Sequence, residues 1–223
     1  QTRYFAHRGF AVLAPDLPGH GLSGGAPLTS IGDMADWIDG LLASLGVAQA
    51  TLVGHSQGVL VALETASRHP ERVAALTLIA GAMAIPVNDA LIDMSQSAPE
   101  KAFRMMTSWG HGPGAHKFDN TQPGHAFLGY GRRVMAQNDG AALHADLVAC
   151  NSYDGGKDAA ASVTQPSLCL LAGKDKMTPV KFGRKMAEQI SGAQYHVFER
   201  AGHFLPAEFP IEVNDAMAAF LSR

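Results

Sequence analysis

A chain of 223 residues, 47% hydrophobic and 17% charged, is long enough for one domain with a sizeable core and lacks the composition of a disordered chain. Its formal net charge of −3, with scattered Lys and Arg residues, indicates no nucleic-acid partner, and no apolar run is long enough to span a membrane. The two cysteines, Cys150 and Cys169, are too few for a disulfide framework, so we expect buried thiols and a cytoplasmic location.

Short apolar runs bounded by Gly or Pro predict five parallel strands, at residues 10–14, 51–53, 73–79, 168–171 and 194–198. Helices are predicted at about residues 30–45, from about residue 59 to Arg68, at 180–190 and at 210–221. Ser30 and Asp33 resemble a capping pair at the start of the first helix. The alternation of strands and helices predicts an α/β fold with a doubly wound, mostly parallel sheet.

The alternation stops between residues 82 and 164. This stretch contains helical patterns at about residues 89–96, 100–109, 126–136 and 141–149, and no convincing strand. We therefore divide the chain into a core formed by residues 1–81 and 165–223 and a helical insertion at residues 82–164.

A G-x-S-x-G pattern, Gly54-His55-Ser56-Gln57-Gly58, lies between a predicted strand and a predicted helix. A serine at such a turn adopts a strained backbone conformation, which flanking glycines without Cβ atoms tolerate. The Gln57 backbone N–H then lies at a helix N-terminus, where it can stabilise an oxyanion. An ordinary strand-to-helix turn would give the same pattern, so further residues are needed to assign a function.

Two further residues complete the set that a nucleophilic serine requires, which is a histidine base and a carboxylate that fixes its tautomer. Asp175 follows the predicted strand at residues 168–171, and His203 follows the strand at residues 194–198. Because the carboxyl ends of parallel strands meet at one edge of a sheet, we expect Ser56, Asp175 and His203 to lie together. Their chain order is also the order expected for one class of serine hydrolases.

With these motifs, the chain resembles the α/β-hydrolase superfamily, in its capped, esterase- and lipase-like branch with a serine nucleophile. The resemblance runs from Gly9 to the C-terminus and includes the segment from Gly9 to Ser23, the turn at Ser56, Gly173-Lys174-Asp175, and Gly202-His203 followed by Glu208-Phe209-Pro210. It implies that Ser56 is the nucleophile, His203 the base and Asp175 the orienting acid, with no cofactor and no metal. Family members that are dehalogenases or epoxide hydrolases have Asp at the nucleophile position, where this chain has Ser56.

The resemblance also implies that residues 82–164 form a helical cap over Ser56. Met94, Met105, Met106 and Trp109 are candidates to line an acyl pocket, and packing within the cap is the alternative. We expect hydrolysis of small to medium carboxylic esters through an acyl-enzyme. Hydrolysis of lactones or C–C bonds, cofactor-free perhydrolysis, and a receptor-like protein with slow turnover remain open, as does the oligomeric state.

Family members begin with a β-hairpin and a third strand, which ends in a loop that supplies a second oxyanion N–H. The first residues here, Gln1 to Ala6, resemble the end of the helix after that loop. We therefore expect a longer polypeptide that carries these strands and the second donor upstream. A gap one strand wide, or another segment, would then separate residues 10–14 from residues 51–53.

Other patterns are weaker. Residues 19–24 match G-x-G-x-x-G, but Pro27 delays the next helix, which disfavours a dinucleotide site. A loop contains His111, His116, Asp119 and His125, whose spacing matches no familiar metal-binding pattern. Asp146, Asp154 and Asp158 are rival acids to Asp175, but each lies in the helical insertion rather than after a strand.

Overall fold

One parallel sheet organises the computed structural model of the chain, which describes residues 1–116, 122, 124–138 and 140–222. Within these residues the strands lie in the order β1 (Ala50–His55), β2 (Val73–Ile79), β3 (Ser167–Ala172) and β4 (Gln194–Phe198). Each neighbouring pair is parallel, so every strand ends at the same edge of the sheet. The four corresponding strand predictions are confirmed.

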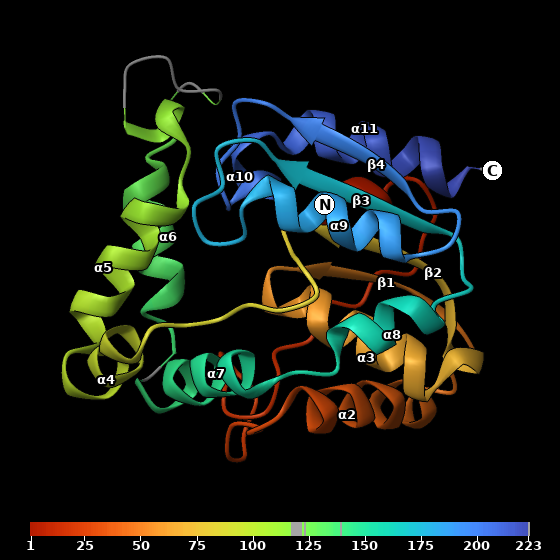
Figure 1. Cartoon of the computed structure of the whole chain (residues 1–223), viewed down its shortest axis with the longest axis horizontal. Helices are drawn as coiled ribbons and strands as arrows, with labels where there is room; N and C mark the ends of the chain where they lie inside the picture. The colour runs from red at the N-terminus through yellow and green to blue at the C-terminus, as the bar shows by residue number, and fades with distance from the viewer. Residues whose placement is uncertain (117–121, 123, 139, 223) are drawn as a thin grey trace.

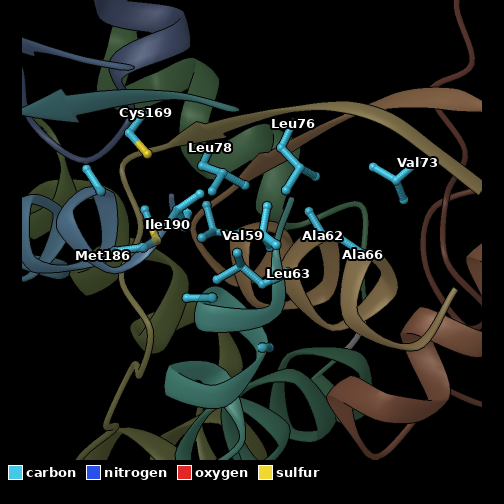
Figure 2. Close-up of a cluster of buried hydrophobic side chains, with 14 of the residues drawn as sticks. Val59, Ala62, Leu63, Ala66, Val73, Leu76, Leu78, Cys169, Met186 and Ile190 are labelled. Carbon is cyan, nitrogen blue, oxygen red and sulfur yellow. The ribbon is translucent and has the colours of Figure 1, made fainter. Parts of the chain in front are cut away.

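Helices cover both faces of the sheet, as predicted for a doubly wound fold (Figure 1). One face packs against α3 (Gln57–Arg68), α8 (Gly156–Ser162) and α9 (Val180–Gln189), and the other packs against α1 (Thr2–Ala6) and α11 (Pro210–Leu221). Alternation along β3 explains this division, because Cys169 and Leu171 face the first layer while Leu168 and Leu170 face the second. Figure 2 shows the first cluster, where Val59 and Leu63 of α3 lie against side chains of β2 and β3.

Helix α2 (Ile31–Ser44) packs on the outside of α3, since Ile31 and Met34 are buried with Leu60 and Val61. It begins where the sequence predicts, and the Ser30 Oγ accepts a hydrogen bond from the Asp33 N–H at 3.0 Å. The short segments η1 (Pro70–Arg72) and α10 (Leu205–Glu208) join the main elements. Within the described residues, no helix is both long enough and apolar enough to cross a membrane.

Between β2 and β3 the chain forms α4 (Asp89–Ser97), α5 (Pro99–Gly110), η2 (Pro113–His116), α6 (Phe127–Met135), α7 (Gly140–Ser152) and α8, with no strand among the residues described there. In Figure 1, α4, α5 and α6 stand beyond the arrowheads of β3 and β4. Leu91, Phe103, Leu143 and Leu147 form a separate buried cluster that joins α4, α5 and α7. Helices α4, α5 and α6 therefore lie at the edge of the sheet where the strands end, whereas α8, the last helix of the insertion, packs on a face of the sheet with α3 and α9 (Figure 1).

The strand predicted at residues 10–14 is wrong, because this segment forms no strand and no bridge. Of this segment Val12 packs against the cluster under α11, while Phe10 and Leu13 are about half exposed. A strand also needs main-chain hydrogen bonds to a neighbour, and no described segment supplies them here. The sequence predicted a gap one strand wide between residues 10–14 and β1. Because residues 10–14 form no strand, the structure has no gap between two strands at this place, and β1 pairs with β2 on its other side.

Candidate active site

Ser56 lies in the turn between β1 and α3, with φ 55° and ψ −119°. This left-handed conformation is strained for a residue with a side chain. A hydrogen bond to the neighbouring strand fixes this turn, because the Ser56 N–H donates to the Ile79 carbonyl on β2 at 3.1 Å. It is also held by a close approach, since a Cβ on Gly54 would overlap the Gly58 carbonyl oxygen. The sequence-based expectation for the turn is thus met at Gly54.

The two glycines of the turn should respond differently to the same change. Gly54→Ala should cost about 1–3 kcal/mol of unfolding free energy or more, because backbone atoms must move to admit the methyl group. Gly58→Ala meets no atom within 4 Å and lies in a helix, so it should be neutral or stabilising by up to about 1 kcal/mol. Urea denaturation of both variants measures the difference. Equal stabilities would contradict the packing described at Gly54.

His203 lies between Ser56 and Asp175. Its Nε2 is 2.8 Å from the Ser56 Oγ, and its Nδ1 is 2.8 Å from the Asp175 Oδ2. A carboxylate only accepts, so Nδ1 carries the proton and donates to Asp175, which leaves the Nε2 lone pair to accept from the Ser56 hydroxyl. The structure thus brings together the three residues that the sequence selected. Both the histidine and the aspartate are buried.

Asp175 is fixed by the turn that follows it. Its Oδ1 accepts hydrogen bonds from the Met177 and Thr178 N–H groups, each at 2.8 Å. The Thr178 hydroxyl lies 2.8 Å from the Asp175 Oδ2 and 2.8 Å from the carbonyl oxygen of Ala80, which has a positive φ of 46°. These contacts leave Oδ2 directed at His203. Thr178 was not selected from the sequence.

His55, the second residue of the motif, contacts the main chain of His203. Its Nε2 lies 2.7 Å from the His203 carbonyl oxygen, which can only accept, so Nε2 carries the proton. Burial, together with the nearby His203 ring, lowers the pKa of His55 to about 4. His55 is therefore neutral at neutral pH and ties the two loops that carry Ser56 and His203.

This lowered pKa predicts acid sensitivity. The unfolded chain takes up a proton at His55 near pH 6.5, while the folded chain does so only near pH 4, so stability should fall as the pH falls through this window. The loss is up to about 3 kcal/mol. His55→Gln keeps a donor and does not titrate, so its urea midpoint should change less between pH 7 and 4.5 than that of the wild type. Parallel pH profiles of the two proteins would contradict this origin.

The loop that carries His203 is also joined to the helical insertion. The His203 N–H donates to the Gly110 carbonyl at 2.6 Å, and the buried Glu208 Oε2 accepts from the Gly112 N–H at 2.9 Å and the Gly202 N–H at 3.2 Å. Burial raises the pKa of Glu208. A Cβ on Gly202 would overlap the backbone at Gly112, so the two loops approach as closely as glycines allow. The end of α5 is therefore fixed directly to the His203 loop.

Ser56 lines a cavity of about 270 Å³. Its polar lining consists of Ser56, Gln57, His20, Asn88, Asn138 and Asp146, and the remaining lining is largely apolar, with no Lys or Arg among the described residues. Cys150 also contributes to the wall, and burial raises the pKa of its thiol to about 12, so it stays protonated. The cavity suits a small, mostly apolar molecule.

The candidate pocket residues fall in different places. Met106 and Trp109 line the cavity, whereas Met105 lies with Trp109 on a separate, open hollow. Met94 packs in the cluster that joins α4, α5 and α7. The Gln57 N–H is the first of α3, so it has no partner within the helix. Its role as an oxyanion donor, and the roles of the methionines and Trp109 in binding, stay predictions.

Within the described residues, none of the rival acids is hydrogen-bonded to His203. Asp146 lines the cavity but is bound to His20, with 3.0 Å between the His20 Nε2 and the Asp146 Oδ2. Asp154 and Asp158 are exposed. The sequence did not indicate His20 or Asn138 as cavity residues, because His20 lies in a turn-rich loop and Asn138 in the helical insertion, far from Ser56 in the chain. In the structure that loop consists of turns, and the next helix begins at Ile31.

The histidine loop gives no metal centre in the described residues. His111 is buried and stacks on Phe204, with 4.4 Å between ring centroids, and Asp119 lies outside the described residues. Elsewhere in the described chain, Asp39, His69 and Glu71 bring ligand atoms within 4.8 Å of one another. The Arg72 Nε already binds the Asp39 Oδ1 at 2.6 Å, which neutralises that carboxylate. Asp39 and His69 therefore belong to an ion-pair network with Arg72.

Comparison with known proteins identifies the family of the chain. The profile of the alpha/beta hydrolase family matches residues 2–216. The chain belongs to this family. Its members are hydrolytic enzymes, and the chain is a hydrolase with the alpha/beta hydrolase fold.

Individual relatives of this alpha/beta hydrolase have several activities. The chain is 30% identical over 206 residues to a pimeloyl-[acyl-carrier protein] methyl ester esterase of Neisseria meningitidis, covering 86% of this chain and 75% of that protein. It is 28% identical over 221 residues to a 2-hydroxymuconate semialdehyde hydrolase of Pseudomonas putida, covering 88% and 72%. The structure of an enol-lactonase from Burkholderia xenovorans matches with a TM-score of 0.84 and 22% identity, over 93% of this chain and 79% of that one, which is a likeness of fold.

Proposed function

We propose that this alpha/beta hydrolase cleaves small to medium carboxylic esters through an acyl-enzyme on Ser56. The observation that supports this most directly is the continuous chain of hydrogen bonds from Asp175 through His203 to Ser56, at 2.8 Å each, beside a small cavity with a largely apolar lining. This arrangement provides a nucleophile, a base and an orienting acid in their expected geometry. The ester named for the relative from Neisseria meningitidis is in line with it.

In this mechanism the Ser56 Oγ attacks the substrate carbonyl while its proton passes to the His203 Nε2. The resulting imidazolium is stabilised by Asp175, and the Gln57 N–H, at the positive end of α3, donates to the oxyanion. His203 then gives its proton to the leaving alcohol, and an acyl-enzyme remains on Ser56. A water molecule, deprotonated by His203, attacks the acyl group, which releases the carboxylic acid and restores the Ser56 hydroxyl.

We further propose that residues 82–164 act as the cap of this site. Helices α4, α5 and α7 supply cavity residues such as Leu91, Met106 and Asp146, while the core supplies Ser56 and Gln57. The cavity is therefore built between the insertion and the sheet. Substrate choice should depend mainly on the insertion, because most of the cavity lining comes from it.

A panel of p-nitrophenyl esters of increasing acyl length, together with simple lactones, tests the proposed function. Steady turnover of the short esters, with a preference over lactones, is the expected result. A single slow turnover per protein molecule would instead indicate a receptor-like protein, and preference for lactones would reassign the substrate class. No hydrolysis of any member of the panel by the folded protein would contradict ester hydrolysis.

A further inference from the structure

A second histidine–aspartate pair lies in the wall of the cavity that contains Ser56. The His20 Nε2 is 3.0 Å from the Asp146 Oδ2, and the His20 Nδ1 is 3.0 Å from the Pro18 carbonyl oxygen. When Asp146 is ionised, both of these oxygens can only accept hydrogen bonds. A His20 ring that is protonated on both nitrogens therefore satisfies both contacts. The bond to Asp146 also raises the pKa of His20. The pair therefore consists of an imidazolium and a carboxylate and has no net charge.

The other oxygen of this carboxylate is unpaired. Asp146 Oδ1 is buried and has no hydrogen-bond partner among the described residues. The nearby amide of Gln57 does not supply one, because its Nε2 donates to the main-chain carbonyl of Asp146 at 3.0 Å. Asn138 presents its side-chain oxygen to the Gly21 N–H instead. A buried acceptor without a partner costs free energy, so a ligand that provides a donor gains from reaching it.

The carboxylate is within reach of a molecule in the cavity. The Asp146 side chain keeps 25% of its surface exposed, and Asp146 and Ser56 line the same space of about 270 Å³. The terminal torsion of an aspartate is soft, so rotation of the carboxylate can present either of its oxygens to that surface. The contact from Gln57, the residue after Ser56, keeps Asp146 close to the nucleophile. A group bound at Asp146 therefore lies in the same cavity as the carbonyl that Ser56 attacks.

We propose that Asp146 is a specificity residue, whose carboxylate accepts a hydrogen bond from a hydroxyl or amide N–H that the substrate carries a few bonds from the scissile carbonyl. The donor is neutral rather than cationic, because His20 already balances the charge of Asp146 and the rest of the lining is mostly apolar. This inference rests on the proposed ester hydrolysis at Ser56 and adds the class of ester, one with a polar donor beside the reacting group.

Two esters of nearly the same shape test it: p-nitrophenyl β-hydroxybutyrate carries a hydroxyl where p-nitrophenyl isovalerate carries a methyl group. The measured quantity is the ratio of kcat/KM for the hydroxy ester to kcat/KM for the methyl ester. This ratio should be roughly tenfold higher in the wild type than in Asp146→Ala, because the variant lacks the acceptor. Asp146→Asn keeps the shape and loses the charge, so its ratio should lie between the two.

Asp158→Ala is the matched control, since this aspartate is exposed on α8 and lies outside the cavity, and it should keep the wild-type ratio. Circular dichroism checks that each variant is folded, and Asp146→Asn decides the test if Asp146→Ala is not. A ratio that is the same in the wild type and the folded Asp146 variants overturns the role of Asp146 while ester hydrolysis stands. If the wild type hydrolyses neither ester nor p-nitrophenyl acetate, the proposed function fails and the inference fails with it.

Discussion

Ser56→Ala should lower kcat for p-nitrophenyl ester hydrolysis by roughly 10⁶-fold, because the proposed acyl-enzyme cannot form without the hydroxyl. The fold should survive, since the side-chain hydrogen bond that the change removes among the described residues is the one to His203. Steady-state kinetics, corrected for the spontaneous hydrolysis of the ester, measure the loss.

Ser162→Ala is a suitable control, because Ser162 is exposed at the end of α8. It should retain wild-type kcat, and circular dichroism should show the same helix content in both variants. Activity in Ser56→Ala close to that of Ser162→Ala would exclude Ser56 as the nucleophile.

Asp175→Asn should lower kcat by about 10⁴-fold, which is less than the loss at Ser56. The surroundings determine which way the new amide points. The Met177 and Thr178 N–H groups both donate to the Oδ1 position, so the amide oxygen must stay there and the amide NH₂ must face His203. An NH₂ donor at Nδ1 forces the proton of His203 onto Nε2, and a protonated Nε2 cannot accept the Ser56 proton.

Asp154→Asn gives the same chemical change on the surface of the insertion and should leave kcat near the wild-type value. Proton NMR of the His203 ring would report the tautomer directly. If Asp175→Asn hydrolysed esters at the rate of Asp154→Asn, the orienting role of Asp175 would be wrong.

The positions of Ser56, Asp175 and His203 could be predicted because the information is local. Each residue follows an apolar run at a turn marked by glycine, and parallel strands end at one edge of the sheet. Local sequence information was not sufficient for the strand predicted at residues 10–14, which the structure does not contain. A short apolar run indicates that a segment tends to be buried, whereas a strand is defined by a hydrogen-bonded neighbour that can be far away in the sequence.

The cavity wall was also beyond the sequence pattern. On α7, Leu143 and Leu147 both pack in the cluster that joins α4 and α5, and both also line the cavity beside Asp146. A helix that meets two neighbours has no single apolar stripe, so periodicity does not indicate which side faces the substrate. His20 and Asp146 are 126 residues apart, so the sequence pattern gave no sign that they form a pair.

The attachment of residues 110–112 to the His203 loop limits how the insertion can be exchanged between family members. A chimera that joins a foreign insertion to this core after residue 81 and before residue 165 replaces the Gly110 carbonyl and the Gly112 N–H, to which His203 and Glu208 are bound. Such a graft alters the support of the proposed base as well as the shape of the pocket. Domain shuffling in this enzyme therefore succeeds only when the incoming segment restores that backbone contact.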